Sequence, residues 1–269
     1  MLFQRILTVV IAAPFLIGAL VYPRTEVFKT VVALCILVGL VEFYQIVHFP
    51  KRERFFAVGV GFLHTLYLLF CPERGGSMPL EITLLVLAIF AFYSLSHLRS
   101  STEGGVTEVA QQISFTLLGS LYVGTFGAFV GLLRDSWHGI FWVFLLLGMT
   151  WLNDTAAYFF GHRFGRHRMA PQISPGKTVE GFLGGFVGSF AGFLIFWFLF
   201  RQPIPFVDGL LLTILVGLFG PLGDLSESLI KRSFGVKDSG NIIPGHGGML
   251  DRIDALLFTA PVIYFFATR

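Results

Sequence analysis

Charged side chains are scarce in this sequence: Asp, Glu, Lys and Arg make up 13% of its 269 residues, whereas 55% are hydrophobic. A soluble protein of this length needs more polar side chains than that to cover its surface. The composition therefore excludes an ordinary soluble domain and predicts a chain that lies in a lipid bilayer. The 32 phenylalanines suit that environment, because an aromatic ring that faces acyl chains is kept from water.

Cysteine is also rare, with only Cys35 and Cys71, and each lies in an apolar run without CxxC or Cys/His spacing. Neither a disulfide nor a cysteine metal site is predicted. The net charge is only +3 and is scattered, which argues against a nucleic-acid partner and is compatible with a surface that faces anionic lipid.

Apolar runs of about 17 to 25 residues can cross the hydrocarbon core as helices, and the sequence contains nine of them. They predict an all-α, polytopic integral membrane protein with about nine transmembrane helices. We expect residues 1–135 to hold the first five spans and residues 136–269 to form the catalytic region. The expected spans are 6–22, 27–47, 55–71, 80–98, 109–133, 140–160, 182–200, 207–230 and 251–267.

Two connections are longer and more polar than the others, at residues 161–181 and 231–250. Two spans separate them, so both loops are expected on the same side of the membrane. Most Lys and Arg residues lie on that side, and the positive-inside rule then places the N-terminus and both loops in the cytoplasm. We therefore expect a protein of the cytoplasmic (inner) membrane with its active site facing the cytoplasm.

One face of the span at 207–230 is strongly polar at its end. Asp224, Glu227, Ser228 and Lys231 follow one another at i, i+3, i+4 and i+7, so they share a helical face. Such a stripe cannot face lipid, and ionisable residues within a membrane span are by default a functional hypothesis.

The next span begins with two acids one turn apart, Asp251 and Asp254, with Arg252 beside them. The helix macrodipole explains one carboxylate in a first turn but not two that are approached by Asp224 from the neighbouring span. Carboxylates surrounded by lysines and arginines suit Mg²⁺ bound together with a polyphosphate. We predict a site for Mg²⁺ and phosphate where the ends of these two spans meet.

The loop between these spans is rich in glycine and contains His246, Gly247 and Gly248. Such a loop can present backbone N–H groups to an anion, although it matches neither common phosphate-loop pattern. His246 has no second ligand at zinc spacing, which favours phosphate contact or loop anchoring.

A second polar group begins at Asp154 and continues through the segment from Ser174 to Gly181, which is interpreted as a turn followed by a helix start. Lys177 is a candidate for phosphate contact. Glu180 near a helix start has an electrostatic explanation as good as a functional one. Glu42 is a lone acid in the span at 27–47, for which an interhelical hydrogen bond and a substrate role both stay open.

The stretch from Ser228 to Asp254, SLIKRSFGVKDSGNIIPGHGGMLDRID, resembles the signature of the phosphatidate cytidylyltransferases, also called CDP-diacylglycerol synthases. The upstream DTAAYFFG and ISPGKTVEG segments are similar to the same family. Two departures are Gly176, where relatives often carry a second lysine, and Ala156, where they often carry glycine; the first puts in doubt how many cations the upstream loop supplies.

This resemblance implies that CTP and phosphatidic acid give CDP-diacylglycerol and pyrophosphate with Mg²⁺, in phospholipid biosynthesis, by direct attack of the lipid phosphate. It also implies a homodimer with membrane lipid around it. The predicted catalytic residues are Asp224, Lys231, Arg232, Lys237, Asp238, Asp251 and Asp254. Of these, Asp224 and Asp251 are the predicted ligands of one or two Mg²⁺ ions. The predicted substrate-binding residues are Asp154, Ser174, Lys177, Glu180, Ser228, His246, Gly247, Gly248 and Arg252.

Two other functions remain open at this point. An ion-coupled transporter also uses intramembrane acids, but these usually lie near the midplane, whereas the acids here gather at one membrane face. Another nucleotide or lipid phosphotransferase is the second alternative; the DGxxAR…GxxxDxxxD pattern of the CDP-alcohol phosphotransferases is absent from the sequence.

Overall fold

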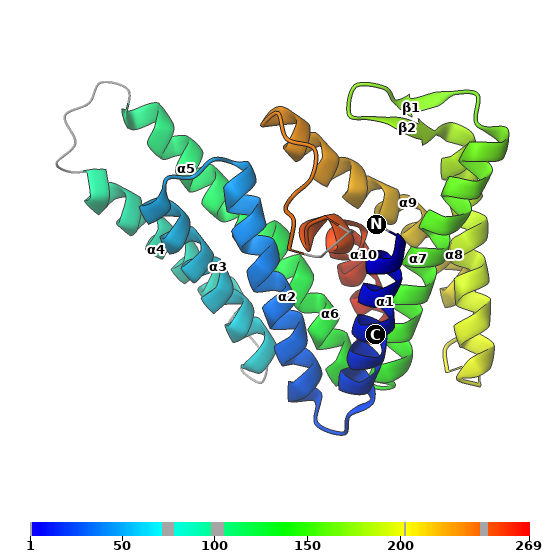
Figure 1. Ribbon diagram of the computed structural model, residues 1–269. Coiled ribbons are helices and arrows are strands. Elements are labelled where there is room, and N and C mark those ends of the chain that lie inside the picture. Colours follow the sequence, from blue (N-terminus) through cyan, green and yellow to red (C-terminus); the bar gives the residue numbers. More distant parts are fainter. Residues whose placement is uncertain (1, 72–77, 98–104, 202, 243–246) are drawn as a thin grey trace.

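The computed structural model describes residues 2–71, 78–97, 105–201, 203–242 and 247–269, and helices dominate it (Figure 1). The predicted all-α fold is confirmed. In chain order the elements are α1 Leu2–Val21, α2 Thr25–Ile46, α3 Lys51–Phe70, α4 Met78–His97, α5 Gly105–Gly119, the π-helix η1 Ser120–Thr125, α6 Phe126–Asp135, α7 Gly139–Phe164, β1 Arg168–Ala170, β2 Ser174–Thr178, α8 Val179–Leu199, α9 Phe206–Ser233 and α10 Leu250–Ala267.

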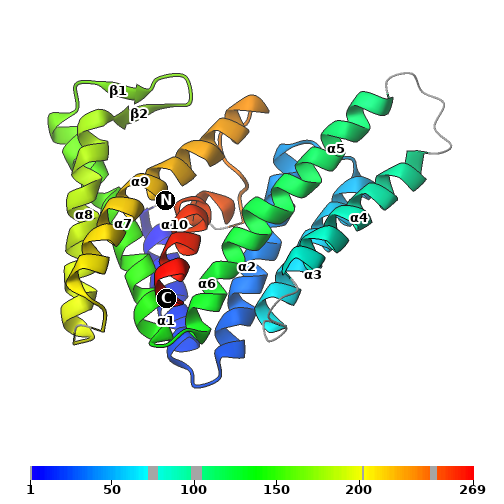
Figure 2. The same cartoon turned by 180° about the vertical axis from the view of Figure 1, so that it is seen from behind.

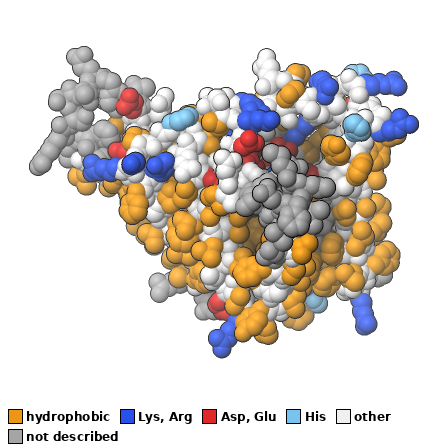
Figure 3. Space-filling view, in the orientation of Figure 1, with side chains coloured by type: hydrophobic (Ala, Val, Ile, Leu, Met, Phe, Trp, Pro, Cys, Tyr) orange, Lys and Arg blue, Asp and Glu red, His pale blue; other side chains and the backbone are white. Residues whose placement is uncertain are grey.

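Six helices within the described ranges are long and apolar enough to cross a membrane: α2, α3, the run Glu108–Asp135, α7, α8 and α9. Shorter apolar stretches lie in α1 and α4. Figure 3 shows hydrophobic side chains over the middle of the visible face and most charged side chains toward its ends. The chain is thus a polytopic integral membrane protein, while the count of nine spans and the division at residue 135 stay predictions.

The span predicted at 109–133 is one continuous run in which η1 joins α5 to α6. A π-turn inserts an extra residue and rotates the following side chains around the helix axis. Gly119, just before η1, lies against α2, and a Cβ at this position would be only 2.5 Å from Tyr44 Oη. Tyr44 Oη donates a hydrogen bond to the Thr116 carbonyl oxygen at 3.0 Å, and this bond links α2 to α5.

Helices α7 and α8 pack closely because α8 presents a stripe of buried glycines to α7. A Cβ at Gly188 would overlap the backbone carbonyl of Leu152, so only glycine permits this approach. Small residues at a helix interface let backbones meet, which is the usual means of helix association in lipid. The packing fixes Asp154 of α7 beside the segment that precedes α8.

That segment is an antiparallel two-stranded hairpin, β1–β2, which the sequence did not predict. The predicted helix start is confirmed, because α8 begins at Val179. Thr178 Oγ1 accepts a hydrogen bond from the Gly181 N–H at 3.1 Å. A threonine at the N-cap satisfies one of the N–H groups that lack an intrahelical partner. The hairpin is therefore held directly over the start of α8.

Both polar connections lie at the same end of the helix bundle. Figures 1 and 2, seen from opposite sides, place the β1–β2 hairpin and the C-terminal end of α9 at that end. This arrangement agrees with the expectation that the two loops share one side of the membrane. The side itself, and its assignment to the cytoplasm, stay predictions.

Candidate active site

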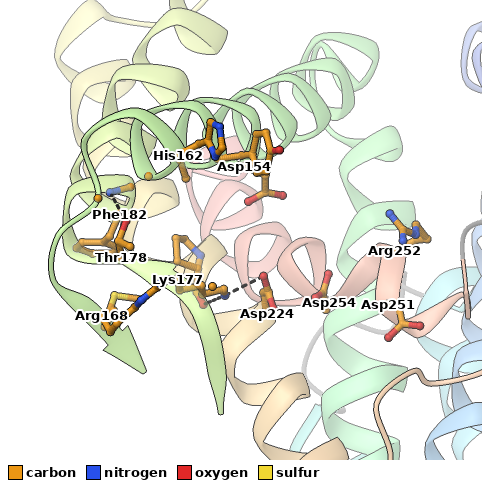
Figure 4. Close-up of a pocket in the computed structure, with 18 residues that line it drawn as sticks. Asp154, His162, Arg168, Lys177, Thr178, Phe182, Asp224, Asp251, Arg252 and Asp254 are labelled. Atoms are coloured by element: carbon orange, nitrogen blue, oxygen red, sulfur yellow. Dashed lines mark hydrogen bonds and ion pairs between the residues drawn. The ribbon is translucent and has the colours of Figure 1, made fainter. Parts of the chain in front are cut away.

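A cavity of about 690 Å³ opens between α7, the hairpin, the start of α8, α9 and α10. Four aspartates from three helices line it: Asp154 from α7, Asp224 from α9, and Asp251 and Asp254 from α10. Figure 4 shows Asp154, Asp224 and Asp254 pointing into the same part of the cavity, with Asp251 farther along. The central expectation from the sequence, that acids of separate spans meet at one place, is confirmed.

These carboxylates affect one another electrostatically. Both Asp154 and Asp254 experience the negative charge of Asp224. Three carboxylates that face one space repel one another unless cations offset them. The cavity is therefore built for positive charge from a lysine, a metal ion or both.

Lys177 supplies part of that charge from strand β2. Its Nζ lies 2.8 Å from Asp224 Oδ2 and 3.4 Å from the Pro221 carbonyl oxygen. The Asp224 side chain is 38% exposed, and its Oδ1 accepts a hydrogen bond from Ser228 Oγ at 3.3 Å. Lys177 and Ser228, both predicted to bind substrate, thus meet at Asp224.

Lys231 lies between two carboxylates deeper in the wall. Its Nζ lies 2.6 Å from Asp251 Oδ1 and pairs with Glu227 Oε2, and these three side chains are at most 11% exposed. Glu227 was absent from the predicted site residues, although its i, i+4 spacing to Lys231 was visible. Buried charges need such partners, because an unpaired charge costs several kcal/mol.

Asp251 also holds its own surroundings together. Its carboxylate accepts backbone N–H groups from Ser239, at 3.1 and 3.2 Å, and from Gly248, at 2.9 Å. Together with Lys231, these donors give both carboxylate oxygens of Asp251 partners within the protein. Asp251 is thus engaged within the protein, whereas Asp224 and Asp254 face the cavity.

The donor set fits Mg²⁺ only when it is shared with phosphate oxygens. Within the described residues no group of three or more His, Cys, Asp or Glu side chains is arranged to hold a metal ion. Mg²⁺ usually takes one or two carboxylates and completes its shell with water and phosphate. Asp224 with Asp254 or Asp154 meets that need, whereas Asp251 would first have to leave Lys231.

Arg232 joins the two polar loops. Its guanidinium donates to the carbonyl oxygens of Ile173, in the turn of the hairpin, and Val236, at 3.4 and 3.2 Å. The other predicted cation of this stretch, Lys237, is exposed together with Asp238. Their predicted contacts with substrate stay predictions.

Glu180 closes the base of the hairpin. Its carboxylate accepts the N–H groups of Arg166 and His167, at 3.0 and 3.2 Å, and lies 2.6 Å from His167 Nδ1. These contacts favour the structural explanation of Glu180 over the functional one.

The remaining predicted residues are spread over the cavity and the glycine-rich loop. Arg252 lines the cavity, and Ser174 begins β2. Gly247 adopts a positive φ of 83°, which favours glycine. His246 lies outside the described residues.

Among the residues that line the cavity, sequence reasoning missed two basic side chains near the hairpin, His162 and Arg168. Arg168 is held by a 2.7 Å bond from Nη1 to the Pro175 carbonyl oxygen, so its guanidinium is fixed at the cavity edge. The density of cations in the segment HRFGRHR, residues 162–168, was the signal that could have found them.

Comparison with known proteins gives the same picture over the whole chain. Residues 3–268 match the cytidylyltransferase family. The phosphatidate cytidylyltransferase of Bacillus subtilis (strain 168) is 34% identical over 269 residues, covering 97% of this chain and 96% of the relative. The enzymes of the same name from Staphylococcus haemolyticus and Thermotoga maritima are each 34% identical, covering 96% and 97% of this chain and 96% and 94% of the relatives.

The family match and these relatives extend over nearly the entire chain, including the helices before residue 135. The polar cavity lies within the matched residues, and its mixture of carboxylates and cations suits a nucleoside triphosphate. The chain belongs to the cytidylyltransferase family and is a nucleotidyltransferase that uses CTP.

Proposed function

We propose that this protein is a phosphatidate cytidylyltransferase, which makes CDP-diacylglycerol from CTP and phosphatidic acid. A phosphate oxygen of the lipid attacks the α-phosphorus of CTP. The bond from that phosphorus to the bridging oxygen of the β-phosphate breaks, and pyrophosphate leaves with the electron pair. The names of the relatives support the choice of lipid substrate.

The observation that carries this proposal is the meeting of Asp154, Asp224 and Asp254 with Lys177 in one cavity at an end of the membrane helices. A lipid phosphate lies at headgroup depth, while CTP comes from water, so their common site has to be at a helix end. The lipid phosphate is already ionised at neutral pH. Alignment and charge neutralisation are therefore the main tasks of the side chains, and no general base is required.

We assign the cavity residues as follows. Lys177 and Arg252 bind phosphate oxygens from opposite sides of the acid group, and Arg168 adds a third cation at the edge. Asp224 together with Asp254 or Asp154 would hold Mg²⁺ jointly with the substrate phosphates. The bound ion would supply positive charge for phosphate oxygens that the lysines and arginines do not reach.

The finer location follows from the same proposal. We place the enzyme in the cytoplasmic membrane with the cavity facing the cytoplasm, because CTP is made there and most Lys and Arg residues lie on that side. We also propose a homodimer, as the family resemblance implies. Cross-linking of purified protein tests the dimer, and protease protection in sealed vesicles tests the orientation.

Purified protein in detergent tests the reaction itself. With CTP, phosphatidic acid and Mg²⁺ we expect pyrophosphate release that needs all three, and a lipid product that contains cytidine and one added phosphate. Excess EDTA is expected to stop release, and added Mg²⁺ to restore it. Diacylglycerol, which lacks the attacking phosphate, is the matched control and should give no product.

Two results would contradict the proposal. Consumption of a CDP-lipid with release of CMP, without CTP-dependent pyrophosphate release, would assign the chain to another phosphotransferase reaction. Gradient-driven ion flux in vesicles, with no nucleotide turnover, would favour the transporter.

A further inference from the structure

Glu42 is an acid of helix α2 that does not line the catalytic cavity, yet it is 1% exposed and both of its carboxylate oxygens accept hydrogen bonds. Its Oε1 accepts a hydrogen bond from the N–H of Met249 at 3.0 Å. Its Oε2 accepts hydrogen bonds from the N–H of Leu250 at 2.8 Å and from the hydroxyl of Ser239 at 3.0 Å. All three donors lie about 200 residues farther along the chain.

The two N–H groups belong to the N-terminal end of α10, where backbone donors have no intrahelical partner. A carboxylate at a helix N-terminus is also favoured by the macrodipole. Glu42 therefore caps α10 from a different helix. The N-cap residue of α10, Met249, makes no side-chain hydrogen bond to the start of the helix, so it does not provide this cap itself.

Two glycines of the signature make room for this carboxylate. A Cβ at Gly240 would lie 2.5 Å from Glu42 Oε1, and a Cβ at Gly248 would lie 2.6 Å from Glu42 Oε2. The sequence suggested that the glycine-rich loop wraps a phosphate. On this side of the loop, the anion that it encloses is the carboxylate of Glu42.

The contacts continue from Glu42 to the cavity wall. Ser239 donates its hydroxyl to Glu42, and its Oγ accepts the Asp251 N–H over 3.3 Å. The Asp251 carboxylate in turn accepts the Ser239 N–H and pairs with Lys231. A shift of Glu42 would therefore move Asp251 and Lys231 together.

We propose that Glu42 is a positioning residue for the transferase reaction: from helix α2, it fixes Ser239, Met249 and Leu250, so that Asp251 keeps its place in the cavity wall and its pairing with Lys231. The inference rests on the proposed function for its effect on turnover. The physical contacts on which it depends are independent of the lipid substrate.

Glu42→Gln tests this with little change in volume. The amide cannot accept at both ends, so at least one N–H of α10 loses its partner and the compensating charge disappears. We expect kcat for CTP to fall about 10²-fold, because a small misplacement of catalytic groups can slow a reaction by that factor. KM for CTP should change less than threefold. Tyr44→Phe is the matched control, because it removes one buried bond from the same helix to α5 and leaves the loop untouched.

Limited proteolysis gives a readout that needs no substrate. Lys237 is exposed in the segment after α9, and Arg166 and Arg168 are exposed before and within β1. In Glu42→Gln we expect trypsin to cut after Lys237 at least fivefold faster than in the wild type, with unchanged cutting at the two arginines. Trypsin should cut Tyr44→Phe at all three of these sites as fast as it cuts the wild type.

A second pair of variants tests the glycine contact. Gly240→Ala drives a methyl group into the Glu42 carboxylate and is expected to lower kcat and to speed cutting at Lys237 in the same way. Gly59→Ala in α3, where nothing lies within 4 Å of the added carbon, should do neither. If Glu42→Gln fails to fold, Gly240→Ala and the milder Ser239→Ala decide the question.

Turnover of Glu42→Gln within twofold of Tyr44→Phe, or equal cutting at Lys237 in both variants, would overturn the inference. A wild type without CTP turnover on phosphatidic acid would instead reject the proposed function. In that case, faster cutting at Lys237 in Glu42→Gln would still support the role of Glu42 in fixing the loop.

Discussion

Asp224→Asn is expected to lower CTP turnover by about 10²- to 10³-fold while leaving the protein folded. The Asp224 side chain is 38% exposed and faces the cavity, so its loss removes little buried contact. Asparagine keeps the size of the side chain and can still bind Ser228. It lacks the negative charge that pairs with Lys177 and that a Mg²⁺ ion requires. Steady-state pyrophosphate release in detergent, with thermal unfolding measured in parallel, checks both parts.

Asp208→Asn is the matched control for this change. Asp208 lies at the start of the same helix, α9, and its carboxylate is 3.8 Å from Arg269 rather than in the cavity. Turnover by this variant should stay within twofold of the wild type. The assignment of Asp224 is wrong if Asp224→Asn retains more than a third of wild-type turnover, or if its turnover loss accompanies an equal loss of folded protein.

Helical spacing explains why the acid group could be predicted. Asp224, Ser228 and Lys231 share a face because residues three, four and seven apart align on any α-helix. Since the spans cross the membrane in alternation, Asp154 and Asp251 had to emerge at the same side as Asp224. Local periodicity and topology together were therefore sufficient to bring these residues to one end of the bundle, where the cavity lies.

Contacts between distant segments could not be predicted in the same way. Glu42 binds Leu250 across 208 residues, and no spacing rule connects a lone acid in one span with the start of another. The sequence therefore left its role open between structure and substrate. The same limit applies to Asp251: its place in the sequence suggested a metal ligand, but only the fold shows that Lys231, Ser239 and Gly248 occupy its carboxylate.

The hairpin β1–β2 was missed for a different reason. Its strands have three and five residues, too few for an alternating pattern to stand out in a glycine- and proline-containing segment. Its position depends on Glu180, whose carboxylate gathers the N–H groups of Arg166 and His167. The sequence therefore predicts where α8 begins but not the hairpin that precedes it.

Lys231→Met is expected to be the most destabilising of the changes considered. Lys231 pairs with Glu227 and Asp251, and removing its charge leaves the Glu227 carboxylate, 2% exposed, without a cation. Breaking a buried ion pair from one side costs about 3 to 5 kcal/mol. For a chain of this size, that corresponds to a fall of about 10 °C in the midpoint of thermal unfolding. CTP turnover should be lost as well, because Asp251 is no longer held from α9.

The double variant Lys231→Met/Glu227→Gln separates the two effects. Replacing the stranded carboxylate with an amide removes the uncompensated charge, so at least half of the lost thermal midpoint should return. Asp251 still accepts the N–H groups of Ser239 and Gly248, which keeps the start of α10 in place. Turnover should not return, because the double variant still lacks the Lys231 side chain that holds Asp251 from α9. Recovery of turnover along with stability would mean that Lys231 serves only to neutralise Glu227; a single variant as stable as the wild type would mean that the buried pair is not required for folding.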